Sequence, residues 1–322
     1  MTGLRAVYRK ELEDHWSSVR FTLLLTVILM IGLIMTFITA SGLRKELEGV
    51  PKPSLVFLML FTSTGALFSF AQFVAFFGAL IGLVLGFDAI NRERTARTLP
   101  KLLAQPIYRD SIINGKFLAG LTTVAVMLVS LLALIAGLDL WVLGVVPGAE
   151  EAGRLAVYLV VSLCYIGFWL GAAVLASVLF RSTATSALAV LALWIFLAFF
   201  VPLGAKVTAD ALAPAPSAVG SAADIDAMLR HEQVKQAVSY VSPIALYSDA
   251  TSIVLDPLRK TTRSLVLVGP MERLSLSRFQ NALPLDQSAL VVAPHLILLV
   301  AITLGCFAAS YTAFMRQEIR SI

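Results

Sequence analysis

Side chains that could perform chemistry are scarce in the apolar stretches of this chain. Four of these stretches contain no Asp, Glu, Lys, Arg or His: residues 21–40, 117–138, 155–180 and 183–203. Ion-coupled carriers need ionisable groups at membrane depth, and intramembrane enzymes need a catalytic set such as HExxH, Ser/His/Asp or paired carboxylates. Neither occurs, so the sequence argues against a proton antiporter, an intramembrane protease and a metalloenzyme.

Two polar side chains remain inside apolar stretches. Gln72 could line a translocation path or bond to a neighbouring helix. His295, which follows Pro294 near the outer end of the last stretch, could contact a substrate or act as an interfacial anchor. Both are candidates for a path through the membrane.

The composition explains why the apolar stretches dominate. The chain has 322 residues, of which 58% are hydrophobic and 14% charged, and its mean hydropathy is +0.87. A soluble domain carries about 25% charged residues, so the natural solvent of this chain is a bilayer. We predict an all-α polytopic membrane protein with six transmembrane helices. Its expected parts are an amphipathic helix, five transmembrane helices, an extracytoplasmic helical domain, a sixth transmembrane helix and a cytoplasmic tail: residues 1–20, 21–203, 204–288, 289–315 and 316–322.

Residues 55–87 form an apolar stretch that is longer than one perpendicular transmembrane helix needs. Either this helix is strongly tilted, or its first part is a separate interfacial or re-entrant piece. The stretch also places Gly78, Gly82 and Gly86 four residues apart, on one helix face. Small residues at this spacing allow close helix packing, either within one subunit or between two.

The distribution of Lys and Arg predicts the orientation. With the N-terminus inside, the inner segments hold 13 Lys and Arg, and the two short outer loops hold 4. Basic residues accumulate in short cytoplasmic loops, so both termini are expected in the cytoplasm. The net charge of +5 is therefore assigned to topology and lipid headgroups rather than to nucleic acid.

The first twenty residues predict a helix that lies in the membrane interface. Apolar side chains recur there at spacings of three and four: Leu4, Val7, Tyr8, Leu12 and Trp16. Trp16 is expected at headgroup depth and Lys10 near lipid phosphates. The alternative is an ordinary surface lead-in to the first transmembrane helix.

The insertion after the fifth apolar stretch is expected to form a small helical cap against the outer membrane surface. Residues 221–240 predict one helix, capped by Ser221. Ser242-Pro243 predicts the start of another, which ends at Asp256-Pro257. Residues 209–219 are rich in Ala and Pro and indicate a linker.

The segment between the second and third apolar stretches, residues 88–116, carries the clearest pattern. It has six Lys or Arg against three acids. Its leucines recur at helical spacing, Thr98 can cap a helix, and Pro106 stops one. The segment is longer than chain reversal needs, which indicates a contact surface for a cytoplasmic partner. The alternative is that it only anchors to anionic lipid.

A run of residues in this segment carries a family resemblance. The run is Glu93-Arg94-x-x-Arg97-Thr98-Leu99-x-x-Leu102-Leu103-Ala104-Gln105-Pro106-Ile107-x-Arg109, followed by Lys116. It resembles the cytoplasmic loop of export-type (type 2) ABC transporter permeases. The likeness is closest to the six-span branch that includes permeases associated with multicopper-enzyme maturation and gliding motility. The family often has Gly where this chain has Arg97, so the turn is expected to be more helical or its contacts more electrostatic.

The two ends of the chain and its outer loop extend the resemblance. Tyr8-Arg9-Lys10-Glu11-Leu12 looks like the family's elbow helix, and Phe314–Arg320 is similar to its closing motif. Ser242-Pro243 with Leu246-Tyr247 also fits members of this branch.

The resemblance implies a permease subunit with several partners. These are two copies of a cytoplasmic ATPase subunit, a second permease expected to be an identical copy, membrane lipids, and in some cases an extracytoplasmic accessory protein. No GxxxxGK[ST] loop occurs in the chain, so ATP and Mg would be bound by the ATPase, and no catalytic, cofactor or metal site is expected here.

By the same resemblance, residues 88–116 contain a coupling helix seated in a cleft of the ATPase. The residues expected to bind it are Glu93, Arg94, Arg97, Thr98, Leu99, Leu102, Leu103, Pro106, Ile107 and Arg109. On the elbow helix, Lys10, Glu11 and Trp16 are expected at the interface.

The leading interpretation is the membrane subunit of an ATP-driven exporter that moves a substrate out of the cytoplasm or inner leaflet. A second interpretation is a non-transporting membrane platform that docks cytoplasmic partners through the same segment. A third is a membrane-embedded lipid-modifying enzyme, which is disfavoured because the outer insertion lacks a paired acid/base cluster.

Overall fold

A computed structural model describes residues 2–49, 55–62, 68–98, 100, 104–215, 222–259 and 282–317, and within these ranges the chain is helical without strands. The helices are α1 (Thr2–Trp16), α2 (Val19–Glu46), α3 (Val56–Thr62), α4 (Phe70–Gly86), α5 (Asn91–Thr95), α7 (Arg109–Val142), α8 (Ala149–Leu179), α9 (Thr183–Ile195), the π-helix η1 (Phe196–Phe200), α10 (Val201–Leu212), α11 (Ala222–Ser239), α12 (Pro243–Leu255) and α14 (Leu285–Arg316).

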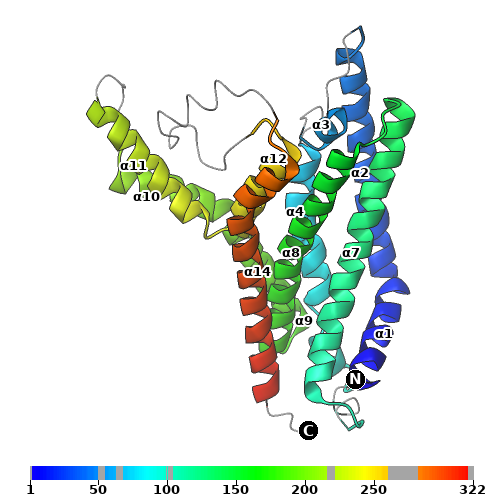
Figure 1. The fold of residues 1–322 in the computed structure, drawn as a ribbon. Helices are drawn as coiled ribbons and strands as arrows, with labels where there is room; N and C mark the ends of the chain where they lie inside the picture. The colour runs from blue at the N-terminus through cyan, green and yellow to red at the C-terminus, as the bar shows by residue number, and fades with distance from the viewer. Residues whose placement is uncertain are drawn as a thin grey trace.

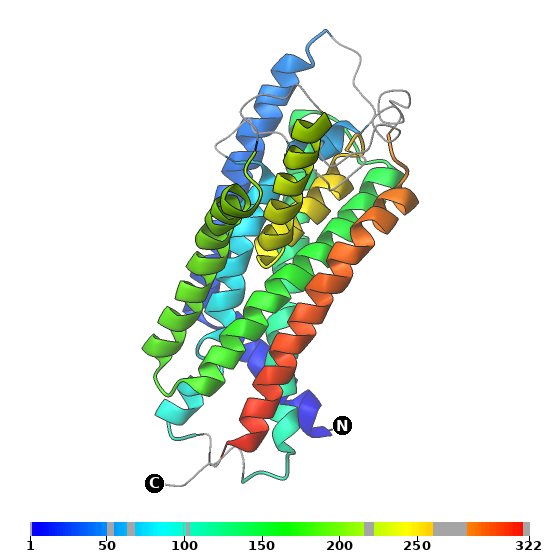
Figure 2. The ribbon, with the colours of Figure 1, turned by 90° about the vertical axis from the view of Figure 1, so that its left-hand side faces the viewer.

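The long helices form an upright bundle (Figures 1 and 2). The start of α1 and the end of α14 lie at the same end of this bundle. At the opposite end, α10 and α11 pair and project sideways as an arm (Figure 1). Helix α8 lies at the centre, packed against α4, α7, α12 and α14.

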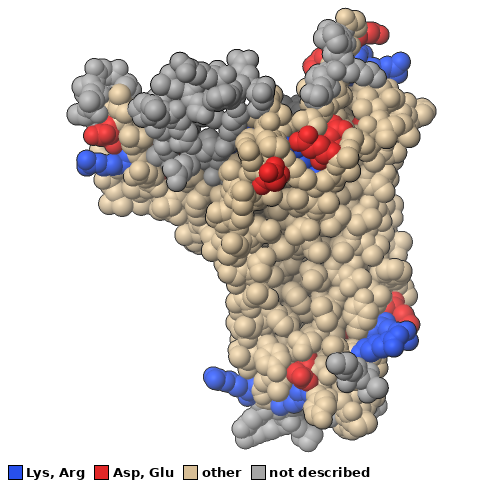
Figure 3. Space-filling view, in the orientation of Figure 1, with Lys and Arg blue, Asp and Glu red and all other residues tan. Residues whose placement is uncertain are grey.

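Six helical stretches are long and apolar enough to cross a membrane: Val19–Glu46, Phe70–Thr95, Arg109–Val142, Ala149–Leu179, Thr183–Leu212 and Leu285–Arg316. This confirms the predicted number. On the face drawn in Figure 3, Lys, Arg, Asp and Glu gather toward the two ends, and a broad belt between them is free of charge. That distribution is what a bilayer-spanning bundle requires.

The predicted loop between the third and fourth spans, residues 139–154, is wrong in its bounds. Helix α7 continues to Val142, and α8 already begins at Ala149. Asp139 and Arg154, predicted as loop residues, are fully buried inside these helices. Helix α2 likewise continues to Glu46, past the predicted end at Ala40. Hydropathy marks the hydrocarbon core, whereas the backbone hydrogen bonds of a helix continue into its polar flanks.

The described parts of residues 55–87 form two helices, which supports the alternative of a separate first piece. The short helix α3 is a separate piece whose side chains are mostly buried. Helix α4 begins with a capping box, in which Gln72 N–H donates to Ser69 Oγ (3.3 Å) and Ser69 N–H donates to Gln72 Oε1 (2.9 Å). Two backbone N–H donors at the start of α4 are therefore satisfied locally, and the helix starts at that point.

The glycine stripe of α4 packs against α8 of the same chain, which decides the question left open by the sequence. A Cβ atom on Gly82 would lie 2.8 Å from the carbonyl oxygen of Ile166 and 2.9 Å from the amide nitrogen of Leu170. A Cβ on Gly86 would lie 2.7 Å from Cβ of Ala173. The two backbones approach closely because these positions carry no side chain.

The fifth span does not end at Leu203 as predicted. It continues from α9 through η1 and α10 to Leu212, so the insertion begins later than Gly204 and residues 209–212 are helical rather than linker. The predicted helix over residues 221–240 is present as α11, and its expected cap, Ser221, lies outside the described residues.

Helix α12 corrects the prediction of a cap resting on the membrane surface. Its bounds agree with the sequence, with Ser242 before the first turn and Pro243 at its start. Its side chains, however, are buried between α4, α8 and α14. Tyr247 stacks on Tyr165 with ring centroids 4.4 Å apart, and its hydroxyl lies 2.9 Å from Ser162 Oγ. The helix is part of the bundle core.

A buried arginine fixes the end of the bundle that lies away from the start of α1. Arg154 of α8 donates to Glu150 Oε1 (3.0 Å), Ser288 Oγ (3.2 Å) and the carbonyl oxygens of Val254 (3.1 Å) and Leu283. These acceptors come from α8, α12, the start of α14 and the residues just before it. One guanidinium therefore ties three helices together, since its fork of donors can bond several acceptors at once.

The close approach of α4 and α8 predicts that Gly82→Ala destabilises the folded protein. The added methyl group meets backbone atoms that cannot rotate away, and overpacking of this kind costs about 1–3 kcal/mol. Thermal unfolding of the purified full chain in detergent measures the effect, as a lowered midpoint. Gly305→Ala on α14 is the matched control, because no atom lies within 4 Å of its Cβ position. Equal midpoints for the two variants would contradict the packing described here.

Candidate functional site

Helix α1 packs along the beginning of α7. A Cβ atom on Gly115 would lie 2.7 Å from Val7 Cγ1 and 3.2 Å from the amide nitrogen of Tyr8, so the helices touch at a glycine. The hydroxyl of Tyr8 donates to Thr122 Oγ1 at 3.1 Å. Trp16, at the end of α1, is 51% exposed. Helix α1 is therefore anchored to the bundle by one face, and it exposes the indole expected at the membrane interface.

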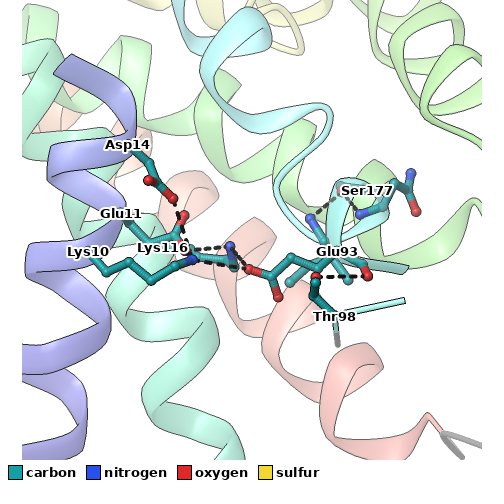
Figure 4. Close-up of polar contacts among 9 residues, drawn as sticks. Lys10, Glu11, Asp14, Glu93, Thr98, Lys116 and Ser177 are labelled. Carbon is teal, nitrogen blue, oxygen red and sulfur yellow. Dashed lines mark hydrogen bonds and ion pairs between the residues drawn. The ribbon is translucent and has the colours of Figure 1, made fainter. Parts of the chain in front are cut away.

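A buried ion cluster joins α1, α7 and the region after α4. Lys116 Nζ lies 2.8 Å from Glu11 Oε1 and 2.9 Å from Glu93 Oε1 (Figure 4). The Lys116 side chain is only 5% exposed, and those of Glu11 and Glu93 are 11% and 12% exposed. Lys10 lies at the rim, 3.2 Å from the same Glu11 oxygen and 3.4 Å from Asp14 Oδ2. We call Glu11, Glu93 and Lys116 the three-helix ion cluster.

Two groups, Glu11 of the cluster and the neighbouring Lys10, have pKa values shifted toward their ionised forms. Burial by itself would raise the pKa of Glu11, but the ammonium groups of Lys116 and Lys10 outweigh it and hold that pKa below its usual value. Burial would lower the pKa of Lys10, and the neighbouring Glu11, Glu93 and Asp14 reverse this and raise it. A buried ion pair adds little net stability, but removing one partner leaves an uncompensated charge. The cluster thus fixes the position of α5 relative to α1 and α7.

The short helix α5 is held against the end of α8. Ser177 Oγ accepts hydrogen bonds from the amides of Ile90 (2.8 Å) and Asn91 (3.1 Å), as drawn in Figure 4. The Asn91 side chain donates to the carbonyl oxygen of Ser182 at 3.3 Å. Ser186 Oγ donates to the carbonyl oxygen of Phe87 at 2.8 Å. These hydrogen bonds fix the turn between α4 and α5 to the corner between α8 and α9.

The end of α5 excludes a more helical turn, the first of the two alternatives expected for Arg97; more electrostatic contacts stay a prediction. This residue has φ 56°, the left-handed conformation that glycine favours, so the turn is not more helical. Thr98 N–H donates to the carbonyl oxygen of Glu93 (2.9 Å), and Arg97 N–H donates to that of Arg94 (3.0 Å). This pair of bonds is a Schellman motif, which normally takes Gly at the position of Arg97. The chain adopts the glycine geometry with an arginine.

Two other arginines of residues 88–116 donate hydrogen bonds to Gln317, the residue that follows α14. Arg94 donates to Gln317 Oε1 and to the carbonyl oxygen of Val178 (3.3 Å). Arg109 donates to the carbonyl oxygen of Gln317 (2.9 Å) and lies over the ring of Phe314. Both guanidinium groups therefore satisfy carbonyl oxygens at the ends of α8 and α14, and brace the segment from within.

The remaining residues predicted to bind a partner fall into two groups. Leu99, Leu102 and Leu103 lie outside the described residues. Thr98 and Pro106 are exposed, whereas Ile107 packs on α1, with its Cγ2 2.8 Å from the Cβ position of Gly3. Ile107 thus contributes to the contact between the segment and α1.

The two candidate path residues both have local structural partners. Gln72 completes the capping box of α4. His295 lies well inside α14 rather than at its start, and its Nε2 atom lies 3.2 Å from the hydroxyl of Tyr240. The cavity that Gln72 lines, together with Thr62 and Asp249, does not include His295. Across the residues that the structure describes, no group of His, Cys, Asp or Glu is arranged to hold a metal ion.

Sequence reasoning missed the partners that lie far apart along the chain. Lys116 was placed at the end of a cytoplasmic loop, yet it is a buried cation inside α7. Ser177 and Gln317 carry no local pattern that distinguishes them from other polar residues at helix ends. The one available signal was that Glu11, Glu93 and Lys116 all belong to motifs of the family resemblance.

The ion cluster predicts that Lys116→Met destabilises the protein strongly. The two carboxylates would lose their buried cation and keep only the half-exposed Lys10 as a counter-ion. Breaking a buried pair costs about 3–5 kcal/mol. The thermal unfolding midpoint of the purified chain measures the loss. Lys45→Met is the matched control, since Lys45 is exposed and has no ion pair among the described residues. An unchanged midpoint for Lys116→Met would show that the cluster does not hold the helices together.

The Schellman motif predicts that Arg97→Gly stabilises the end of α5. A non-glycine residue in the left-handed region is disfavoured by about 1 kcal/mol, and glycine removes this strain. Amide hydrogen exchange at Thr98, whose N–H closes the motif, should slow about fivefold. Arg97→Ala removes the same guanidinium but keeps the strain, so it should not slow exchange. Faster exchange in Arg97→Gly than in the parent would contradict the motif.

The family of the chain is identified from its sequence. The sequence matches the family described as ABC-2 family transporter protein over residues 5–319. No curated protein matches it significantly. The match includes α1, the three-helix ion cluster, all six candidate spans and Gln317. This chain is a multi-pass membrane protein that belongs to the ABC-2 transporter family, whose members are the membrane permease components of ABC transporters and are not themselves enzymes.

Proposed function

We propose that this chain is the permease subunit of an ATP-driven exporter, in which an ATPase docks on residues 88–116 and a substrate leaves the cytoplasm or the inner leaflet. Permeases of this family pair with an ATPase subunit, which supports the kind of partner. The three-helix ion cluster supports the coupling of the docking segment to the membrane helices. It connects the expected docking segment to α1 and α7 through Glu93, Glu11 and Lys116.

Docking would use apolar anchors surrounded by charge. Leu99, Leu102 and Leu103 supply the apolar side chains, and the exposed Arg97 and Thr98 flank them in the sequence. Buried apolar anchors dominate the affinity of such interfaces, while rim charges set orientation and association rate. Arg94 and Arg109 support the docking segment indirectly, because both donate hydrogen bonds to Gln317 at the end of α14.

Movement of the docked segment would be transmitted through rigid contacts. A displacement of α5 pulls Glu93, and Lys116 passes it to α7 and Glu11. The hydrogen bonds of Ser177 and Arg94 pass it to α8, the helix at the centre of the bundle. Close-packed elements transmit displacement because they have little room to deform. The spans of one subunit would therefore rock as a unit and open a path beside them.

The path is proposed to lie between two permeases, with an identical copy as the partner and two ATPase subunits that bind ATP and Mg. The lipid-facing sides of α2, α9 and α14 expose many large apolar side chains, which a bilayer or a second permease can cover. We infer an inner-membrane location with both termini in the cytoplasm. The placement of α1 and the end of α14 at one end of the bundle supports this orientation.

The docking proposal predicts that Leu102→Asp or Leu103→Asp abolishes association with the ATPase while the permease still inserts. Replacing an apolar hot spot by a carboxylate should weaken binding by at least about tenfold. Co-purification of the ATPase with the tagged permease in mild detergent measures the loss. Gln105→Asp adds the same charge to an exposed position of the segment and should leave co-purification intact. Normal recovery of the ATPase with both leucine variants would refute the docking site.

A further inference from the structure

A cavity of about 420 Å³ lies beside the three-helix ion cluster, and no step proposed above uses it. It is bounded by α1, α2, α4, α5, α7 and α8. Part of its wall is apolar: Phe21, Leu24, Val84, Leu85, Leu170 and Val174. The rest is charged and includes Arg20, Asp88 and Arg92 together with the ion cluster. The cavity is therefore amphipathic, with one apolar side and one ionic side.

The charges that line the cavity balance each other. Four acids (Glu11, Asp14, Asp88 and Glu93) face four bases (Lys10, Arg20, Arg92 and Lys116). Burial lowers the pKa of His15, the other titratable group in the lining, so its imidazole is neutral near neutral pH. The lining as a whole carries no net charge, which disfavours a strongly anionic or strongly cationic ligand.

One of the four bases differs from the others. Lys116 and Lys10 pair with Glu11 and Glu93, and Arg20 Nη1 lies 3.2 Å from Asp88 Oδ2. Arg92 is exposed and has no ion pair with any residue that the structure describes. An unpaired guanidinium presents a planar fork of donors that fits phosphate oxygens. The cavity therefore offers one open position for a phosphate group.

The cavity lies at the depth where headgroups meet acyl chains. Phe21 and Leu24 come from the first turns of α2, and Val84 and Leu85 from the last turn of α4, so the apolar wall is the edge of two candidate spans. Trp16 is exposed at the end of the neighbouring α1, as side chains of the interfacial belt are. Val84 is 38% exposed, so the apolar wall reaches the surface of the bundle.

We propose that this cavity binds the headgroup of a zwitterionic glycerophospholipid from the same leaflet as α1. The phosphate occupies the open position at Arg92, the amine lies among the surrounding carboxylates, and the first carbons of the acyl chains contact Leu24 and Val84. The charge balance favours a headgroup with one phosphate and one amine over an anionic one. The volume suits the end of a small molecule and is too small for a helix of another chain.

Such a lipid would brace the joint between α1 and α5 from the membrane side. It touches the same two helices that Glu11 and Glu93 connect, and it does so independently of any ATPase. The inference stands apart from the docking proposal, because it concerns the permease alone.

Lipid binding to the purified full chain tests the proposal. The delipidated protein in detergent is titrated with phosphatidylethanolamine, and saturable binding is followed by native mass spectrometry. Arg92→Gln should weaken the apparent affinity about tenfold, since a charge-assisted bond to phosphate is lost. Arg9→Gln removes one exposed charge from α1 outside the cavity and should leave the affinity unchanged. Equal binding by Arg92→Gln and the parent overturns the proposal.

A second variant and two other ligands test the apolar wall, the charge of the headgroup and the need for acyl chains. Val84→Trp adds bulk at an exposed wall position, and it should reduce saturable binding about tenfold without loss of folded protein. Phosphatidylglycerol should bind more weakly than phosphatidylethanolamine; tighter binding overturns the zwitterionic assignment. Soluble glycerophosphoethanolamine should compete poorly because it lacks acyl chains. Competition as strong as that of the lipid would mean that a soluble phosphate ester, not a lipid, is the occupant.

Discussion

The arrangement of α1, α5 and α7 depends on one ammonium group held between two carboxylates. Lys116 comes from α7, Glu11 from α1 and Glu93 from α5, and none of the three side chains is more than 12% exposed. Removing such charges from water is unfavourable unless each finds its partner, so the cluster accepts only one relative position of the three helices. Its contribution is geometric specificity more than net stability. In a permease driven from outside the membrane, that specificity would keep the driven segment in register with the helices that move.

At each end of the bundle, a buried cation bonds to acceptors from several helices. At the end away from the start of α1, the guanidinium of Arg154 donates to acceptors from α8, α12, α14 and the chain just before α14. Between the ends, contacts are apolar, and the backbones of α4 and α8 approach at Gly82 and Gly86. Inside a bilayer, apolar burial does not favour one helix over lipid, so close packing and polar bonds must specify the partner. The bundle is therefore fixed by ionic contacts at its ends and by small residues along its middle.

The number of spans and the start of α12 could be predicted because each depends on local chemistry. Long apolar stretches require a bilayer, and Ser242-Pro243 is a local start signal for a helix. The family was also visible in the run from Glu93 to Arg109. The separation of α3 from α4 could not be predicted, because it depends on a capping box inside an apolar stretch. The burial of α12 and of Lys116 could not be predicted either, since both depend on partners about a hundred residues away in the chain.

The expectation of a more helical turn at Arg97 failed for a different reason. Replacing the glycine common in the family by arginine suggested a changed turn, yet Arg97 has φ 56°, the left-handed conformation that glycine favours. The two Schellman hydrogen bonds and the anchoring of α5 by Ser177 outweigh the local preference of one residue. Tertiary context overrides a preference of about 1 kcal/mol in this way.

The contacts of Gln317 have a consequence for biogenesis. Gln317 follows the sixth span, yet it bonds the end of α8 and receives both Arg94 and Arg109. During synthesis the segment after α4 emerges long before this glutamine exists. The two arginines therefore acquire their acceptors on Gln317 only once the last helix has been inserted. In the proposed docking, a half-made chain would present no finished surface to the ATPase, and assembly with it would follow completion of the membrane bundle.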